Sequence, residues 1–265
     1  AFAALVSMGA APRASIRMGE GDYASAERIL GNSFTLLLLV AAVLTPVFTI
    51  WRDELLLAFG ATEKTIQFAS EYMGIYALGT VFVQLALGLN AFITAQGYAK
   101  ISMFTVLIGA ACNIVLDPIF IFGFNMGVRG AAIATVLSRF VELAVIAGWT
   151  HAHAARNRFV HGVYRKIHIP GRLAKQIFAK GMPLMYNEIL WAAGTAILNQ
   201  CYSMRGLEAV AATNISSTIF NVFNVVYMAL GVAVGIVVGQ KLGAGEMEEA
   251  RETDTRMIVF AVLSC

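Results

Sequence analysis

The sequence predicts an all-α protein that crosses a membrane several times. Of its 265 residues, 58% are hydrophobic and 13% are charged, and the mean hydropathy is +0.72. Soluble domains carry about 25% charged residues. The apolar residues form long runs separated by short polar loops, and a helix that spans a bilayer needs about 20 apolar residues. These observations favour a polytopic helical membrane protein.

Eight spanning segments are expected, and the first and last of them are truncated. In chain order they cover about residues 1–16, 33–50, 72–95, 101–122, 128–150, 182–202 and 208–238, and an eighth begins near residue 257. Gly74, Gly79 and Gly88 interrupt the third span, and a Gly/Asn-rich turn at 123–127 precedes the fifth. Both ends of the chain lie inside apolar runs, so we interpret it as an internal piece of a longer protein.

The distribution of basic residues predicts the topology. Fourteen of the 19 Lys and Arg residues lie in loops on one side of the expected membrane, four lie on the other side, and Arg139 lies within a span. Cytoplasmic loops are enriched in Lys and Arg. The loops around 17–28, 97–100, 151–180 and 239–256 are therefore expected to be cytoplasmic.

Two features argue against other classes of site. The cysteines are three in number and scattered, and no HExxH or CxxC motif is present, so no disulfide framework, structural metal site or cofactor is expected. The basic segment 151–180 is interpreted as a cytoplasmic connector attracted by anionic membrane lipids. Nucleic acid is not an expected partner.

An internal repeat appears at an offset of 224 residues. The segment Met18-Gly-Glu-Gly-Asp22 matches Leu242-Gly-Ala-Gly-Glu246. Upstream of these segments, small residues recur every four positions in both copies: Ser7, Ala11, Ser15 and Gly19, and then Gly231, Gly235, Gly239 and Gly243. Such stripes let membrane helices approach each other closely.

The repeat predicts the organisation of the complete protein. Its matching loops fall on the same side of the membrane, so the two halves are expected to run parallel. Six spans separate a helix from its counterpart, which predicts twelve helices in two six-helix lobes. Residues 1–150 would be helices 2–6 of the N-terminal lobe, 151–180 the connector, and 181–265 helices 7–9 at the start of the C-terminal lobe.

Polar side chains inside two of the apolar runs form the main candidate site. Asn113 and Asp117 are four residues apart and share one helix face. Thr135 follows on the next helix, and both Asp117 and Thr135 lie about 9–10 Å below the same membrane surface. An amide, a carboxylate and a hydroxyl at one depth predict a pocket for a small cation.

These residues also have structural interpretations. Asn and Thr in membrane helices often only hydrogen-bond neighbouring helices. Asp117 is different, because a carboxylate at this depth costs at least about 2.5–3.5 kcal/mol unless it is protonated, paired or hydrated. Pro118 removes a backbone donor beside it. On the helix of Thr135, Arg139 and Glu142 are expected to pair with each other.

Glu188, next to Asn187, is the second candidate for coupling or substrate binding. It lies near the start of the sixth span, five residues after Pro183. The alternative is a carboxylate that stabilises the start of a helix or extends toward the membrane surface.

The chain resembles the multidrug and toxic compound extrusion (MATE) transporters, in their bacterial multidrug branch. The resemblance is carried by Leu116-Asp-Pro-Ile-Phe-Ile-Phe-Gly123, Met126-Gly-Val-Arg-Gly-Ala-Ala-Ile-Ala-Thr135 and Gly239-Gln-Lys-Leu-Gly-Ala-Gly245. It implies a bacterial inner-membrane antiporter, expected to act as a monomer. Such a protein exports organic, often cationic or aromatic compounds in exchange for H⁺ or Na⁺. It also implies a cation site at Asn113, Asp117 and Thr135, completed by a carboxylate on a preceding helix.

Other functions stay open at this point. A flippase for lipid-linked precursors shares this general architecture, but would be expected to carry more cationic residues in its central cavity. A channel or a structural bundle would not require duplicated lobes. A membrane enzyme is not expected, because DDxxD, HExxH and nucleophile–base motifs are absent.

Overall fold

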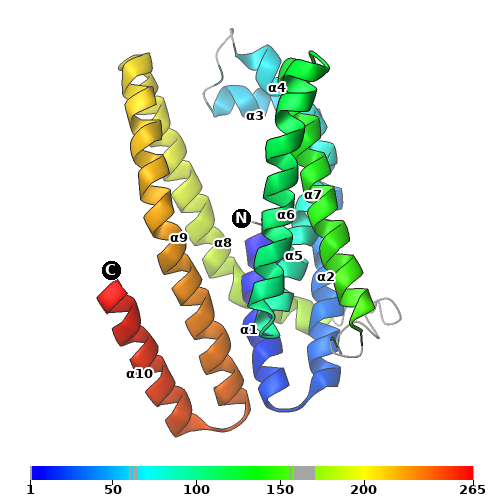
Figure 1. Cartoon of the computed structure of the whole chain (residues 1–265), viewed down its shortest axis with the longest axis vertical. Helices are drawn as coiled ribbons and strands as arrows, with labels where there is room; N and C mark the ends of the chain where they lie inside the picture. The colour runs from blue at the N-terminus through cyan, green and yellow to red at the C-terminus, as the bar shows by residue number, and fades with distance from the viewer. Residues whose placement is uncertain (1, 60, 62–64, 155–156, 158–170, 265) are drawn as a thin grey trace.

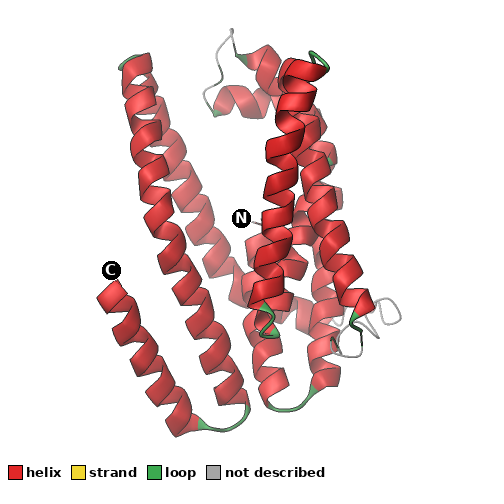
Figure 2. Cartoon of the chain, viewed as in Figure 1, coloured by secondary structure: helices red, strands yellow, loops and turns green. Residues whose placement is uncertain are grey.

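The computed structural model describes residues 2–59, 61, 65–154, 157 and 171–264, and this part of the chain contains helices and turns without strands (Figures 1 and 2). The helices are α1 (Phe2–Gly19), α2 (Tyr23–Ile50), α3 (Arg52–Ala58), α4 (Ile66–Leu78), α5 (Thr80–Ala95), α6 (Ala99–Pro118), the π-helical η1 (Ile119–Gly123), α7 (Gly127–Ala152), α8 (Gly171–Ser203), α9 (Leu207–Gly243) and α10 (Met247–Ser264). In the predicted connector 151–180, residues 155–156 and 158–170 lie outside the described residues.

The described helices include five segments suited to crossing a membrane. The helices α2, α6 with η1, α7 and residues 211–243 of α9 are long and apolar enough, and the bent pair α4–α5 passes as one further span. They coincide with the expected second, fourth, fifth, seventh and third spans. The other three spans remain predictions, and α1, α8 and α10 lie at their positions.

The N-terminal helices pack around small and aliphatic side chains. Val6 and Ala10 of α1 and Leu37 of α2 are almost completely buried, and Phe92 of α5 joins the same core. Small residues on α1 allow α2 and α5 to approach it closely. The helices α8 and α9 also pack against α1. The helices α8 and α9 therefore join the N-terminal helices mainly through α1 (Figure 1).

The third span is broken at one of its three glycines. The helices α4 and α5 meet at Gly79 with a bend of 56°, whereas Gly74 and Gly88 lie inside helices. A Cβ atom at Gly79 would lie 2.5 Å from Cγ2 of Val136 on α7. The break therefore occurs where a side chain of another helix fills the space beside the backbone.

The predicted repeat is confirmed by the backbone of the two matching turns. Each of the five backbone hydrogen bonds from Glu20 N→Ile16 O to Ala26 N→Asp22 O recurs 224 residues later, from Ala244 N→Gln240 O to Ala250 N→Glu246 O. Gly21 and Gly245 have φ angles of 76° and 81°, a conformation that glycine adopts without strain. The two turns therefore have the same fold.

The equivalent helices α1 and α9 contact each other reciprocally at these turns. A Cβ atom on Gly19 would lie 2.1 Å from the carbonyl oxygen of Gln240, and one on Gly243 would lie 2.0 Å from that of Ile16. Under the repeat, Gly19 corresponds to Gly243 and Ile16 to Gln240. Gln240 Nε2 also donates to Ala95 O at 3.0 Å. The contact therefore has the two-fold character expected of parallel repeats.

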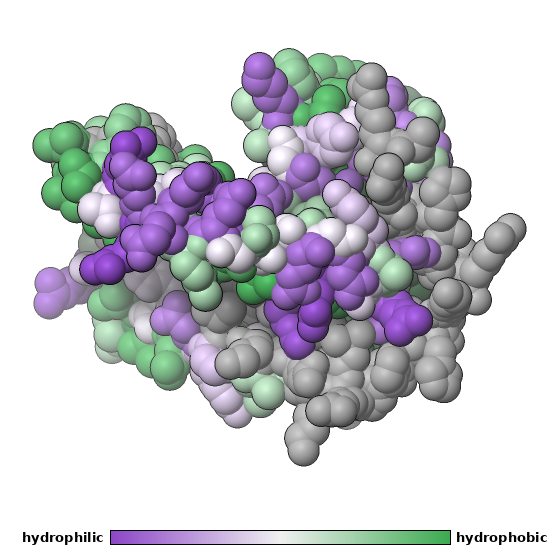
Figure 3. All heavy atoms as spheres, turned by 90° about the horizontal axis from the view of Figure 1, so that it is seen from below, coloured by the Kyte–Doolittle hydropathy of each residue, from purple (hydrophilic) through white to green (hydrophobic). Residues whose placement is uncertain are grey.

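The turns gather at the two ends of the helices. The connections α1–α2, α5–α6 and α9–α10 lie at one end together with the end of α7, and the connections α6–α7 and α8–α9 lie at the other (Figure 1). Viewed from the first end, hydrophilic residues gather across the middle of the molecule (Figure 3). The described parts of the loops expected to be cytoplasmic thus share one end, and their cytoplasmic location remains a prediction.

Candidate functional site

A close helical hairpin of α6, η1 and α7 carries the candidate cation ligands. Pro118 ends α6 and is followed by the π-helical turn η1, and Met126 N donates to Phe120 O at 3.1 Å across the turn. A Cβ atom on Gly130 would lie 2.7 Å from the carbonyl carbon and oxygen of Phe120. Glycine at this position therefore lets the first turn of α7 pack directly on the backbone of η1.

Asn113 and Asp117 are brought together on α6. Asn113 Nδ2 donates to Asp117 Oδ1 at 3.3 Å, and both residues are half-buried. The neighbouring Ile114 and Val115 are exposed on the apolar side of the same helix. One amide donor offsets part of the desolvation of the Asp117 carboxylate.

Thr135 lies on α7 and has other partners. Its Oγ1 donates to Ala131 O at 2.9 Å and lies 3.4 Å from the hydroxyl oxygen of Tyr72 on α4. Within the described residues, no hydrogen bond joins Thr135 to Asp117. The structure therefore assembles two of the three expected ligands and ties the third to a tyrosine that the sequence analysis did not single out.

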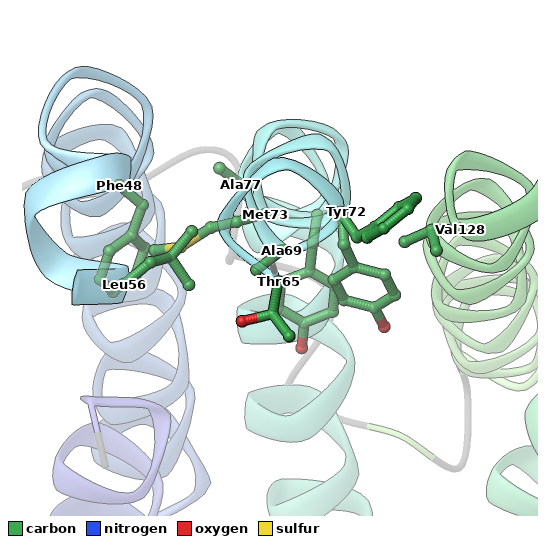
Figure 4. A pocket seen from close by; sticks show the side chains of 10 residues that line it. Phe48, Leu56, Thr65, Ala69, Tyr72, Met73, Ala77 and Val128 are labelled. Carbon is green, nitrogen blue, oxygen red and sulfur yellow. The ribbon is translucent and has the colours of Figure 1, made fainter. Parts of the chain in front are cut away.

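Tyr72 also lines an apolar cavity of about 630 Å³ between α2, α3, α4 and the start of α7 (Figure 4). The cavity is lined by aromatic, aliphatic and sulfur-containing side chains together with one threonine: Phe48, Leu56, Thr65, Phe68, Ala69, Tyr72, Met73, Tyr76, Ala77 and Val128. Its size lies within the range of small-molecule sites. Tyr72 connects this cavity to the candidate cation ligands, because its hydroxyl oxygen lies 3.4 Å from Oγ1 of Thr135.

Glu188 and Asn187 lie apart from the Asp117 pair. They are on α8, where Glu188 is half-buried and Asn187 is exposed. The helix packs against α1 and α9 rather than against α6 or α7. Among the described residues neither side chain forms a hydrogen bond or an ion pair with another. Their proposed role in coupling or substrate binding stays a prediction.

The expected pairing of Arg139 with Glu142 is confirmed. Arg139 Nη1 donates to Glu142 Oε2 at 2.7 Å, and the Glu142 side chain is completely buried. A Cβ atom on Gly109 of α6 would lie 3.1 Å from Cβ and Oε2 of Glu142. The absent side chain at Gly109 thus provides the space into which this carboxylate fits.

The chemistry of the Asp117 region suits a small, hard cation. A carboxylate, an amide oxygen and a hydroxyl are the oxygen donors that such cations prefer. In the described part of the chain, no three His, Cys, Asp or Glu side chains form a cluster that could hold a metal ion. Oxygen donors of this kind suit a hard cation better than a transition metal, and a cation site at these residues remains a prediction.

Comparison with known proteins gives similarity along most of the chain. A family model described as MatE matches residues 1–119 and 183–265. The probable multidrug resistance protein YoeA of Bacillus subtilis is 25% identical over 254 residues, which is 93% of this chain and 55% of the relative. The multidrug export protein MepA of Staphylococcus aureus is 28% identical over 227 residues, which is 85% of this chain and 49% of the relative.

Solved structures give the same result. The crystal structure of MATE in the bent conformation matches with a TM-score of 0.86 and 26% identity, covering 99% of this chain and 58% of that one. The outward-facing conformation of a multidrug resistance MATE family transporter matches with a TM-score of 0.84 and 25% identity, covering 99% and 59%. The chain spans about half the length of the curated relatives it matches.

Proposed function

We propose, because this chain belongs to the MatE family, that the complete protein exports small organic compounds in exchange for H⁺ or Na⁺. The compounds would be cationic or aromatic, and the protein would act as a monomer in a bacterial cytoplasmic membrane, with lipid around it and without a cofactor. The observation that carries the proposal is the Asn113–Asp117 pair, a hydrogen-bonded carboxylate inside an apolar helix.

Neutralisation of Asp117 is the proposed coupling step. An ionised carboxylate inside the membrane costs at least about 2.5–3.5 kcal/mol, and a bound proton or Na⁺ removes much of that cost. Because Asn113 faces Asp117 with its amide nitrogen, its carbonyl oxygen remains available to a cation. Thr135 would join them by turning its hydroxyl away from Tyr72.

The coupling would act through the arrangement of the two lobes. A ligand shifts an equilibrium only by its different affinity for the two states. The C-terminal helices contact the N-terminal lobe through α1, so rotation about this contact would open the space between lobes toward one side or the other. Cation binding at Asp117 would favour one of these arrangements and compound binding the other.

Replacement of Asp117 tests the proposal. Asp117→Asn in the complete reading frame keeps the size of the side chain but removes its charge, so we expect ion-driven efflux to fall at least about tenfold. Efflux of a cationic dye is measured in a pump-deficient host, with the H⁺ and Na⁺ gradients collapsed one at a time.

A matched carboxylate serves as the control. Asp53→Asn alters an exposed residue outside the apolar helices and should leave efflux near the wild-type value. Wild-type efflux from a normally expressed Asp117→Asn protein would refute the coupling role. Absence of dye export from the wild type, together with transfer of a labelled lipid-linked precursor, would favour the flippase.

A further inference from the structure

Arg139 places a positive charge on the inner face of α7, near the middle of the helix. It lies one helical turn after Thr135, about 18 Å along the axis from the start of α7 at Gly127. Ala132 and Ile146, which are 0% exposed, share this side of the helix, and Leu143 between them packs against the hydrophobic core. Arg139 therefore lies on the same side of α7 as these buried and core-packed residues.

The guanidinium nevertheless remains accessible. The side chain of Arg139 is 39% exposed, whereas that of its partner Glu142 is 0% exposed. A guanidinium carries five N–H donors, and within the described residues Arg139 forms one hydrogen bond, through Nη1. The other four donors have no acceptor in the described part of the chain and remain available to a ligand.

The ion pair does not join two helices. Both residues belong to α7, three positions apart, and the second oxygen of Glu142, Oε1, has no partner on α6 or elsewhere among the described residues. A pair within one helix adds no link between elements, and burial of the Glu142 carboxylate is costly. What the pair does achieve is to fix the guanidinium, with Gly109 making room for the carboxylate that holds it.

We propose that Arg139 is a specificity-determining residue that binds the oxyanion of a transported amphiphile, and that Glu142 positions it. Planar guanidinium groups bind carboxylate, sulfonate and phosphate oxygens in a bidentate manner. The substrates would thus include aromatic compounds that carry an acidic group, in addition to the cations that Asp117 attracts. This inference rests on the proposed export function and deepens it by naming a second substrate class.

Two dyes that differ by one ester provide the test. Rhodamine 110 carries a free carboxylate, and rhodamine 123 is its methyl ester. Export of each is measured in vesicles containing the complete transporter, as the KM and the maximal rate. For Arg139→Gln we expect the ratio of the KM for rhodamine 110 to the KM for rhodamine 123 to rise about tenfold or more. The reason is that the guanidinium group that binds the carboxylate is lost.

Three further variants separate specificity from folding. Arg139→Lys keeps the positive charge but lacks the planar guanidinium, so it should raise the KM ratio by a smaller factor. Glu142→Gln should raise it by releasing the guanidinium from its position. Arg129→Gln is the matched control, since it makes the same change on the same helix at an exposed arginine paired with Glu71, and it should leave the ratio unchanged.

Each result has a defined meaning. An unchanged KM ratio in Arg139→Gln would overturn the inference while leaving the export function intact. An equal loss of export of both dyes by an Arg139→Gln protein of normal thermal stability would also overturn the inference, because Arg139 would then act in coupling. Failure of the wild type to export either dye would count against the proposed function itself and against the inference that rests on it.

Discussion

Single residues stabilise the turn shared by the two repeats in different ways. After α1, Asp22 Oδ1 accepts a hydrogen bond from the backbone N–H of Ser25 at 3.0 Å and caps α2. After α9, Lys241 Nζ donates to Glu249 Oε2 at 2.5 Å, and these residues occupy the positions of Arg17 and Ser25. The backbone of the turn is thus common to both repeats, while the side chains that reinforce it differ.

We expect acid to weaken the cap of α2. The hydrogen bond from Ser25 holds the pKa of the Asp22 carboxyl below its ordinary value. A pKa lowered by folding means that the stabilisation is present above the ordinary value and is lost as the pH falls through the lowered one. Amide hydrogen exchange in the first turn of α2, corrected for its intrinsic rate, should therefore accelerate below about pH 4.

Two substitutions at position 22 check this explanation. Asp22→Asn keeps an acceptor oxygen that does not titrate, so the acid acceleration should disappear while the cap is retained. Asp22→Ala should exchange faster at every pH. If the asparagine variant showed the same acceleration in acid as the wild type, another group would be responsible.

At the scale of elements, the break between α4 and α5 depends on a contact with α7. Gly79 has an ordinary helical backbone, with φ −80°, so its importance is steric rather than conformational. An added methyl group would meet the side chain of Val136. We expect Gly79→Ala to destabilise the protein by about 1–3 kcal/mol through overpacking, measured as thermal stability in detergent.

A second substitution should relieve that strain. Val136→Ala removes the atoms that the new methyl group meets. The double variant should therefore lose less stability than the sum of the losses in the two single variants. Gly148→Ala on α7 is the matched control, because a Cβ atom there meets nothing within 4 Å. Additive effects of Gly79→Ala and Val136→Ala would show that the contact does not determine the break.

At the scale of the whole molecule, the reciprocal contact of α1 with α9 holds the two lobes together at one end. Carbonyl oxygens of Ile16 and Gln240 occupy the space beside the two glycines, and a backbone atom cannot rotate out of the way as a side chain can. Gly19→Ala and Gly243→Ala should therefore both separate α1 from α9 and favour the arrangement in which this end is open.

Labelling of a buried cysteine measures this opening. Ser15 is completely buried beside Gly239, so Ser15→Cys, in a protein otherwise without cysteine, reports separation of the helices. We expect either glycine variant to raise maleimide labelling about tenfold, which corresponds to about 1.4 kcal/mol. Gly235→Ala, in open space on the same stripe, should have no effect, and equal labelling in all three variants would contradict the expectation.

Much of the site could be predicted from sequence because its signals are local. The spacing of Asn113 and Asp117 determines that they share a helix face, and the structure joins them by a hydrogen bond. The pairing of Arg139 with Glu142 follows from their separation of three residues for the same reason. Tyr72 could not be found in this way, because 63 residues separate it from Thr135.

The sequence by itself determined the membrane class, the positions of five of the apolar helical segments and the repeated turn. The hydrophobic periodicity, the positions of glycines and the short-range hydrogen bonds depend on residues that are close together in the sequence. These features can therefore be predicted from the sequence alone. Tertiary structure alone decided that the third span bends at Gly79 rather than at Gly74 or Gly88, and that α1 meets α9 through two glycines. Packing decides such features because it depends on which distant side chain or carbonyl group occupies the neighbouring space.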